Sequence, residues 1–218
     1  SIAAYAVTES DYAKYPESCE LCEWAKKIRH FRFCEYDEKN KNLQSETVDI
    51  QGTDIDETAN ILNVFKNAVK NEYKVEFINS MISDLNLIGF DITEIGIENT
   101  NNPTEPMRLY IQEKKRTSKT YQNNMSNGMF RAVSILIHLN FILNRPNSQL
   151  MVIDDLGEGL DFRCSTGLIK LLIRKIEESN SNIPGSSIQL LISTNDQFVM
   201  NCTDLKYWQI VIREGEQV

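Results

Sequence analysis

The chain has 218 residues, 41% of them hydrophobic and 25% charged, which is ordinary for one globular domain or a domain with a small subdomain. The formal net charge of −8 argues against a protein that grips nucleic acid without sequence preference, because neutralising phosphates requires a surplus of Lys and Arg. No apolar run is long enough to span a membrane and no signal peptide is visible. We therefore expect a cytoplasmic protein without a membrane partner.

The first fifty residues contain a cluster of metal-binding residue types. Cys19 and Cys22 form a CxxC pair, and His30 and Cys34 follow, so the ligands of a tetrahedral zinc site are present. However, residues 18–34 have the pattern of one continuous amphipathic helix, with no Gly or Pro for the turn that such a site needs. We expect reduced thiols on a helix, and a zinc-dependent binding module is the weaker alternative.

The next stretch predicts two helices and a β-hairpin. A helix begins near Asp56, and Asp54 or Asp56 can cap it. A second helix runs through Phe77 and Leu85 and ends at Gly89, a natural C-cap, and the two helices should pack together. The apolar residues then alternate in DITEIGIEN and in MRLYIQEKK, and the turn-forming run NTNNPTEP between them predicts two antiparallel strands.

Four basic residues follow the hairpin, namely Lys114, Lys115, Arg116 and Lys119. We interpret them as a solvated loop between a strand and a helix, and a local nucleic-acid contact is the alternative.

From residue 121 onward, helices and strands alternate. The run NNMSNGMFRAVSILIHLNFIL predicts a Gly-containing turn and an apolar helix, QLMVIDD a strand, CSTGLIKLLIRKIEES a helix, IQLLIST a buried strand and YWQIVIRE a last strand. This layout predicts an α/β fold with a mostly parallel sheet covered by helices. We place a boundary here, so that residues 1–120 form a helical and β-hairpin lid region and residues 121–218 form a lobe.

Two aspartates, Asp154 and Asp155, end the strand QLMVIDD, at the sheet edge where α/β proteins bind ligands. In nucleotide enzymes the first such carboxylate holds Mg²⁺ and a neighbouring acid orients the attacking water. Apolar strands that end in Asp are common, so the pattern alone is weak. Its combination with MSNGMFR before it and LISTND after it is more specific.

This combination resembles the C-terminal lobe of the ABC-type ATPase head, particularly the RecF-like, SMC-like and OLD-type branch of the P-loop NTPases. The motifs there run in the order signature, Walker B, D-loop and switch, and the resemblance covers residues 122 to about 196. It implies that Ser126, Asn127 and Gly128 form the signature, which contacts the γ-phosphate of ATP on a second head. A helix N-terminus suits an anion, although SNG standing alone would be a simple N-cap turn.

The resemblance also implies roles for the strand-end residues. Asp154 would be the Walker B ligand of Mg²⁺, Asp155 would replace the usual catalytic Glu, and Asn195 would replace the usual switch His. Residues 157–161, ending in Asp161, would be the D-loop at the interface between two heads. Asp is one methylene shorter than Glu and Asn cannot carry a proton, so both replacements favour slow hydrolysis or ATP used as a conformational clamp.

A Walker A loop, GxxxxGK[ST], is missing from the sequence, because no glycine is followed by Lys. The nine glycines are Gly52, Gly89, Gly96, Gly128, Gly157, Gly159, Gly167, Gly185 and Gly215. We expect the loop upstream of Ser1, with the chain being a segment of something longer.

Two functions are therefore open. One is an ATP- and Mg²⁺-dependent ATPase head that pairs with a second head and controls an effector subunit such as a nuclease or toxin. The resemblance implies a setting in DNA repair, with DNA as a further partner, or in bacterial anti-phage defence. The alternative is a degenerate head without hydrolysis that serves as an assembly scaffold.

Overall fold

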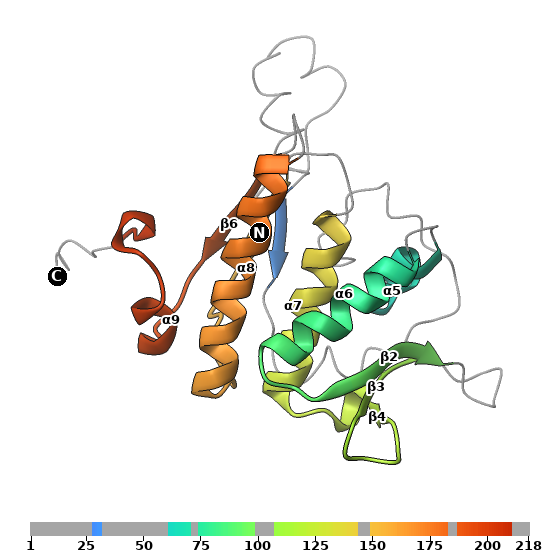
Figure 1. The fold of residues 1–218 in the computed structure, drawn as a ribbon. Coiled ribbons are helices and arrows are strands. Elements are labelled where there is room, and N and C mark those ends of the chain that lie inside the picture. Colours follow the sequence, from blue (N-terminus) through green and yellow to red (C-terminus); the bar gives the residue numbers. More distant parts are fainter. Residues whose placement is uncertain are drawn as a thin grey trace, which may run out of the picture.

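The computed structural model describes the backbone of residues 28–31 and, with side chains, residues 61–70, 74–98, 107–143, 149–182 and 187–210. These segments form two three-stranded sheets with helices between and beside them (Figure 1). The predicted zinc ligands Cys19, Cys22 and Cys34 lie outside the described residues. Within the described part of the chain, no helix is both long and apolar enough to cross a membrane.

One sheet is entirely parallel and has the order β1-β5-β6, with β1 at Ile28–Phe31, β5 at Gln149–Ile153 and β6 at Ile188–Ile192. Ile28 pairs with Leu150, and Gln149 pairs with Ile188, so the carboxyl ends of β5 and β6 meet at one edge. The long helix α8, Phe162–Asn182, makes the crossover from β5 to β6. The predicted α/β fold with a parallel sheet is therefore confirmed.

The predicted helix over residues 18–34 is wrong in its last part, because residues 28–31 form the strand β1. The backbone of this segment pairs in parallel with β5, and His30 lies opposite Val152. Pairing with a strand more than a hundred residues away overrides the local helical pattern, which is a weak determinant by itself. Although β1 comes before residue 121, it completes the sheet of the lobe, and the proposed domain boundary stays a prediction.

The predicted last strand is also wrong over the residues described. Residues 205–207 form the short 3-10 helix η3, Leu205–Tyr207, and residues 208–210 have no strand partner in the described chain. The Asp204 side chain accepts a hydrogen bond from the Lys206 N–H at 3.2 Å, and the Trp208 indole donates to the Thr203 carbonyl. These local bonds favour a turn over a strand.

The second unit contains the two predicted helices and the hairpin. Helix α5, Ile61–Lys70, packs on α6, Lys74–Leu87, through an edge-on contact of Phe65 with Phe77. The end of α6 is a Schellman turn, in which Phe90 N–H donates to the Leu85 carbonyl and Gly89 has φ +112°. Strands β2, Ile92–Glu98, and β3, Arg108–Glu113, are antiparallel as predicted, and the short β4, Thr120–Tyr121, extends them.

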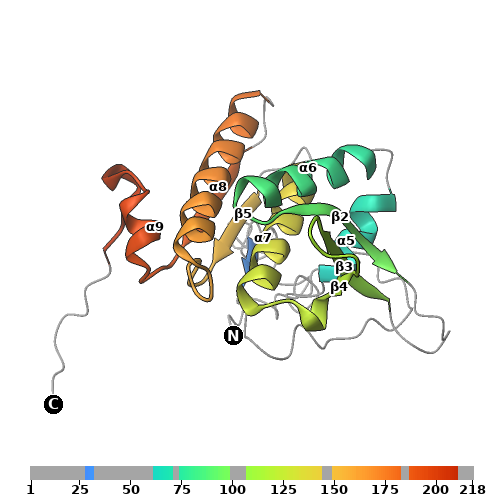
Figure 2. The same cartoon turned by 60° about the horizontal axis from the view of Figure 1, so that its bottom comes forward.

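Helix α7, Asn127–Leu143, is the centre of the core. It follows the 3-10 turn η2, Gln122–Asn124, and nearly every residue from Gly128 to Ile142 is buried. A helix that is apolar all round belongs in an interior. Figures 1 and 2 show α7 between the helices and hairpin on one side and the parallel sheet with α8 on the other. The helix therefore holds the two units together.

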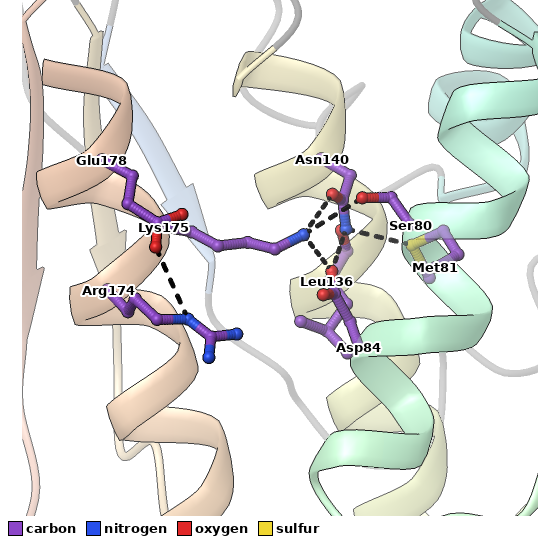
Figure 3. Close-up of polar contacts among 8 residues, drawn as sticks. All are labelled: Ser80, Met81, Asp84, Leu136, Asn140, Arg174, Lys175 and Glu178. Carbon is purple, nitrogen blue, oxygen red and sulfur yellow. Dashed lines mark hydrogen bonds and ion pairs between the residues drawn. The ribbon is translucent and has the colours of Figure 1, made fainter. Parts of the chain in front are cut away.

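A buried polar cluster, here called the interhelix cluster, joins α6, α7 and α8 (Figure 3). It consists of Ser80, Asp84, Asn140 and Lys175. The Lys175 ammonium forms an ion pair with Asp84 and donates to the Asn140 side-chain oxygen at 2.8 Å and to the Ser80 hydroxyl at 3.3 Å. Asn140 in turn donates to Asp84 at 2.8 Å. The Asp84 side chain is only 3% exposed, so the charge is buried but compensated.

Candidate functional site

The carboxyl edge of the parallel sheet gathers the polar residues predicted to carry the chemistry. Asp154 and Asp155 directly follow β5, and Ser193 and Asn195 follow β6. Because Ile153 and Ile192 lie side by side at the ends of the paired strands, both turns leave the sheet at the same place. The short helix α9, Gln197–Asn201, begins directly afterwards.

Ser193 contacts both aspartates, and the three residues are here called the strand-end cluster. The Ser193 hydroxyl donates to Asp154 Oδ1 and accepts a hydrogen bond from the Asp155 N–H at 3.0 Å. The second oxygen of Asp154 has no hydrogen-bond partner among the described residues. Among the described residues, one oxygen of the first carboxylate is thus held by Ser193 and the other has no partner.

Asp155 has two features that a purely structural residue rarely combines. Its backbone φ of +50° lies in the left-handed region, which is strained for a residue with a Cβ, though less so for Asp than for most. Its Oδ1 is buried and has no hydrogen-bond partner within the described part of the chain. Buried acceptors are nearly always satisfied, and strain persists mostly at functional sites, so both features point to a ligand contact.

The predicted D-loop follows as a tight turn with two glycines held close to other elements. The Glu158 N–H donates to the Asp155 carbonyl and the Leu160 N–H to the Gly157 carbonyl, both at 3.1 Å. A Cβ on Gly157 would come within 2.2 Å of the Asp196 carboxylate. A glycine at this position therefore allows the predicted D-loop to pack closely against the turn after β6. The turn that follows β5 therefore touches the turn that contains the predicted switch residue.

The predicted signature lies at the N-terminus of α7 and contacts the D-loop. A Cβ on Gly128 would meet the Gly159 carbonyl oxygen at 2.1 Å. The buried Arg131 guanidinium donates through Nη1 to the Glu158 backbone carbonyl and side-chain carboxylate, each at 2.9 Å. The predicted signature and the predicted D-loop are thus in direct contact. Ser126 is exposed and caps the helix, because its hydroxyl accepts from the Met129 N–H at 3.2 Å.

The remaining predicted residues are in different situations. Asn127 and Asn195 are both exposed. Asp161 is exposed as well, but its carboxylate caps α8 by accepting from the Cys164 N–H at 2.8 Å, and this hydrogen bond holds the pKa of Asp161 below its ordinary value. Burial, followed by the charge of Asp161, raises the pKa of the Cys164 thiol to about 11, so this cysteine remains protonated and unreactive near neutral pH.

The strand-end cluster offers the hard oxygen ligands that Mg²⁺ prefers, and the orphan oxygen of Asp155 adds an acceptor for a bound water or metal. Among the described residues, no three His, Cys, Asp or Glu side chains are grouped closely enough to enclose a metal ion. Magnesium in nucleotide enzymes is commonly bound by one or two protein oxygens together with phosphates and water. The residues of the strand-end cluster fit that kind of site.

Two residues of this region were missed by the sequence reasoning. Ser193 stands between a buried strand and the switch position, and a polar residue directly after a strand was a signal that could have been used. Arg131 is part of the quoted run MSNGMFR, but its contact with Glu158 joins positions 27 residues apart and has no local sequence signature.

Comparisons with known proteins give a fold likeness and no family. No model of a known protein family matches the chain, and no curated protein matches it. Among solved structures, the chain is similar to an SMC ATPase described for ATP-driven dimerisation and DNA-stimulated activation, with 13% identity, a TM-score of 0.45, and coverage of 65% of this chain and 78% of that one.

Two archaeal SMC head domains are also similar. The head of Pyrococcus yayanosii, with its coiled coil and joint, has 14% identity and a TM-score of 0.45, and the match covers 90% of this chain and 32% of that one. The head of Pyrococcus furiosus, bound to the C-terminal domain of ScpA, has 12% identity and a TM-score of 0.42, with coverage of 90% and 56%. The chain thus spans about a third and about half of these two relatives, and the likeness by itself assigns neither activity nor residues.

Proposed function

We propose that the chain is the C-terminal lobe of an ABC-type ATPase head that binds ATP with Mg²⁺ and hydrolyses it slowly. The observation that carries this proposal is the strand-end cluster. Two carboxylates stand at the carboxyl edge of a parallel sheet. Within the described chain, one of them has an oxygen without a partner, and the other has a strained backbone and a buried acceptor without a partner. This is the arrangement expected beside a bound phosphate and its cation.

Each residue has a definite part in this mechanism. Bound Mg²⁺ would neutralise charge on the phosphates during transfer. Asp154 would hold the cation through Oδ2, and the orphan oxygen of Asp155 would accept a hydrogen bond from the attacking water and orient it. The exposed Asn195 amide would donate a hydrogen bond to the γ-phosphate. Since Asp155 is short and Asn195 carries no proton, turnover is slow.

The signature and D-loop provide the second half of the proposal, which is pairing with another head. Ser126, Asn127 and the buried Gly128 lie at the positive end of the α7 dipole, and Arg131 ties this helix to the D-loop. If a second head bound here with its ATP facing the N-terminus of α7, that ATP would contact both the signature and the D-loop. We further propose a cytoplasmic setting, an effector subunit and DNA as partners, and a role in DNA repair or anti-phage defence.

The scaffold alternative also has support in named residues. Asp155 and Asn195 stand where Glu and His are usual in the family that the sequence resembles. A head with both replacements can bind nucleotide, pair with its partner and remain assembled without hydrolysis.

The decisive experiment measures Mg²⁺-dependent phosphate release by the full-length protein that contains this chain and the expected upstream Walker A loop. Asp154→Ala removes the metal-ligand carboxylate, so we expect release to fall at least about a hundredfold, in line with the loss of a positioned catalytic group. The matched control is Asp91→Ala, an exposed aspartate beside β2 whose side chain makes no hydrogen bond or ion pair in the described part of the chain. Equal turnover in Asp154→Ala and wild type would refute the ATPase proposal, and no turnover in wild type despite ATP binding would favour the scaffold.

A further inference from the structure

Ser193 joins the ends of the two central strands through both its backbone and its side chain. Its N–H donates to the Ile153 carbonyl at 3.0 Å, and its carbonyl accepts from the Leu156 N–H at 3.3 Å. Its hydroxyl accepts from the Asp155 N–H at 3.0 Å and donates to Asp154 Oδ1. No other residue described after β6 hydrogen-bonds to both aspartates.

The two hydroxyl bonds act on different parts of the strand-end cluster. The bond to Oδ1 fixes the rotation of the Asp154 carboxylate, so that Oδ2 is the oxygen left for a cation. The bond from the Asp155 N–H stabilises the backbone at the residue whose φ is +50°. Groups that hydrogen-bond a metal-ligating carboxylate are known to set its orientation and its affinity for the metal.

A purely structural role would be simpler, because serine commonly hydrogen-bonds nearby backbone at the end of a strand. However, Ser193 is exposed, and its hydroxyl donates to a side-chain carboxylate that has no other hydrogen bond or ion pair in the described chain. A bond in this position adds little to stability, about 1 kcal/mol at most. The specific effect of the Ser193 hydroxyl is to orient the Asp154 carboxylate and to hold the backbone of Asp155.

We propose that Ser193 is a positioning residue, which aligns Asp154 for the cation and holds Asp155 in its left-handed conformation. The proposal rests on the proposed function, since it assumes that Asp154 binds the metal of a nucleotide complex. Ser193 also joins the end of β5 to the end of β6 through its hydrogen bonds. Ser193 lies two residues before Asn195, so a shift of the switch turn on contact with phosphate would be transmitted directly to the metal ligand.

The test measures metal binding and not turnover. Mn²⁺ is used as a paramagnetic substitute for Mg²⁺, and its affinity is determined by electron paramagnetic resonance on the full-length protein with a non-hydrolysable ATP analogue. Ser193→Ala removes the hydroxyl, and we expect Mn²⁺ to bind about 10- to 100-fold more weakly, the range found for groups that orient metal ligands. Ser193→Thr keeps the hydroxyl, and because Ser193 is exposed the added methyl has room, so affinity should return to within about threefold of wild type.

The matched control is Ser187→Ala, an exposed serine directly before the opposite end of β6, and it should bind Mn²⁺ as wild type does. Thermal unfolding of each variant separates positioning from stability, because Ser193→Ala should lower the free energy of unfolding by about 1 kcal/mol at most. If wild type binds the Mn²⁺–nucleotide complex and Ser193→Ala binds it equally well, Ser193 is not a positioning residue while the proposed function survives. If wild type itself does not bind the complex, both proposals are overturned.

Discussion

Serine and aspartate side chains occur in both the interhelix cluster and the strand-end cluster, but the carboxylates of the two clusters have different partners. In the interhelix cluster the Asp84 carboxylate receives an ammonium and an amide, and both donors come from helices that the cluster joins. In the strand-end cluster, Asp154 keeps a free oxygen, and Asp155 keeps a buried oxygen without a partner in the described chain. No cationic side chain is bonded to either aspartate within that part of the chain.

The difference shows how the fold separates stability from function. Charges taken out of water must be compensated inside the protein, and in the interhelix cluster the Lys175 ammonium and the Asn140 amide do this for the Asp84 carboxylate. A carboxylate that is left partly uncompensated on a strained backbone lowers stability, and it persists when a ligand supplies the missing interactions. We therefore expect substitutions in the two clusters to act in opposite directions on folding.

The largest effect is expected from Asp84→Ala in the interhelix cluster. The substitution leaves the Lys175 ammonium, 14% exposed, without its carboxylate, and breaking one side of a buried ion pair lowers the free energy of unfolding by about 3–5 kcal/mol. Urea denaturation followed by circular dichroism measures the change. The double variant Asp84→Leu/Lys175→Met removes both charges and should recover most of the loss. A loss below about 1 kcal/mol for Asp84→Ala would show that the pair is not compensating a buried charge.

A smaller effect of opposite sign is expected from Asp155→Gly in the strand-end cluster. Glycine adopts φ +50° without strain and removes the buried carboxylate oxygen, so the free energy of unfolding should rise by about 1 kcal/mol. The same variant should lose phosphate release in the full-length protein, since no group then orients water. Gain of stability with loss of turnover is the result that distinguishes a ligand site from a structural turn. A destabilised variant would indicate that Asp155 supports the fold.

The smallest effect on stability is expected from Asp161. Its carboxylate is exposed, and it accepts a hydrogen bond at the N-terminus of α8. Its pKa in the folded protein lies below the ordinary value of 3.8, mainly because its carboxylate accepts from the Cys164 N–H. A carboxyl whose pKa is lowered by folding contributes stability above its unfolded pKa and loses it as the pH falls through the folded pKa.

Asp161→Asn keeps the helix cap but removes this charge, so the comparison isolates the titration. We expect wild type to exceed the variant by roughly 0.5 kcal/mol or less, because an exposed charge is screened by solvent. The advantage should stay constant from about pH 7 to pH 5 and shrink below about pH 4. Urea denaturation at several pH values measures it, and an advantage that grows on acidification would contradict the assigned direction.

The sequence predicted those parts of the fold whose determinants are local. Gly89 after the periodic residues of α6 predicted the helix end, and the structure gives it φ +112° in a Schellman turn. The alternating residues of β2 and β3 on either side of a turn-forming run predicted the hairpin. The apolar strand β5 ending in Asp154 and Asp155 was identified in the same way, because hydrophobic period and turn residues act within a few positions.

The tertiary structure alone decided which distant segments meet. Residues 28–31 joined β5 as a strand against their helical pattern, because backbone hydrogen bonds to a neighbouring strand outweigh local preference. Ser193 came to lie against Asp154, 39 positions earlier, only because β5 and β6 are parallel neighbours with aligned ends. The sequence supplied the carboxylates, and the pairing of the strands determined which of their oxygens remain open to a ligand.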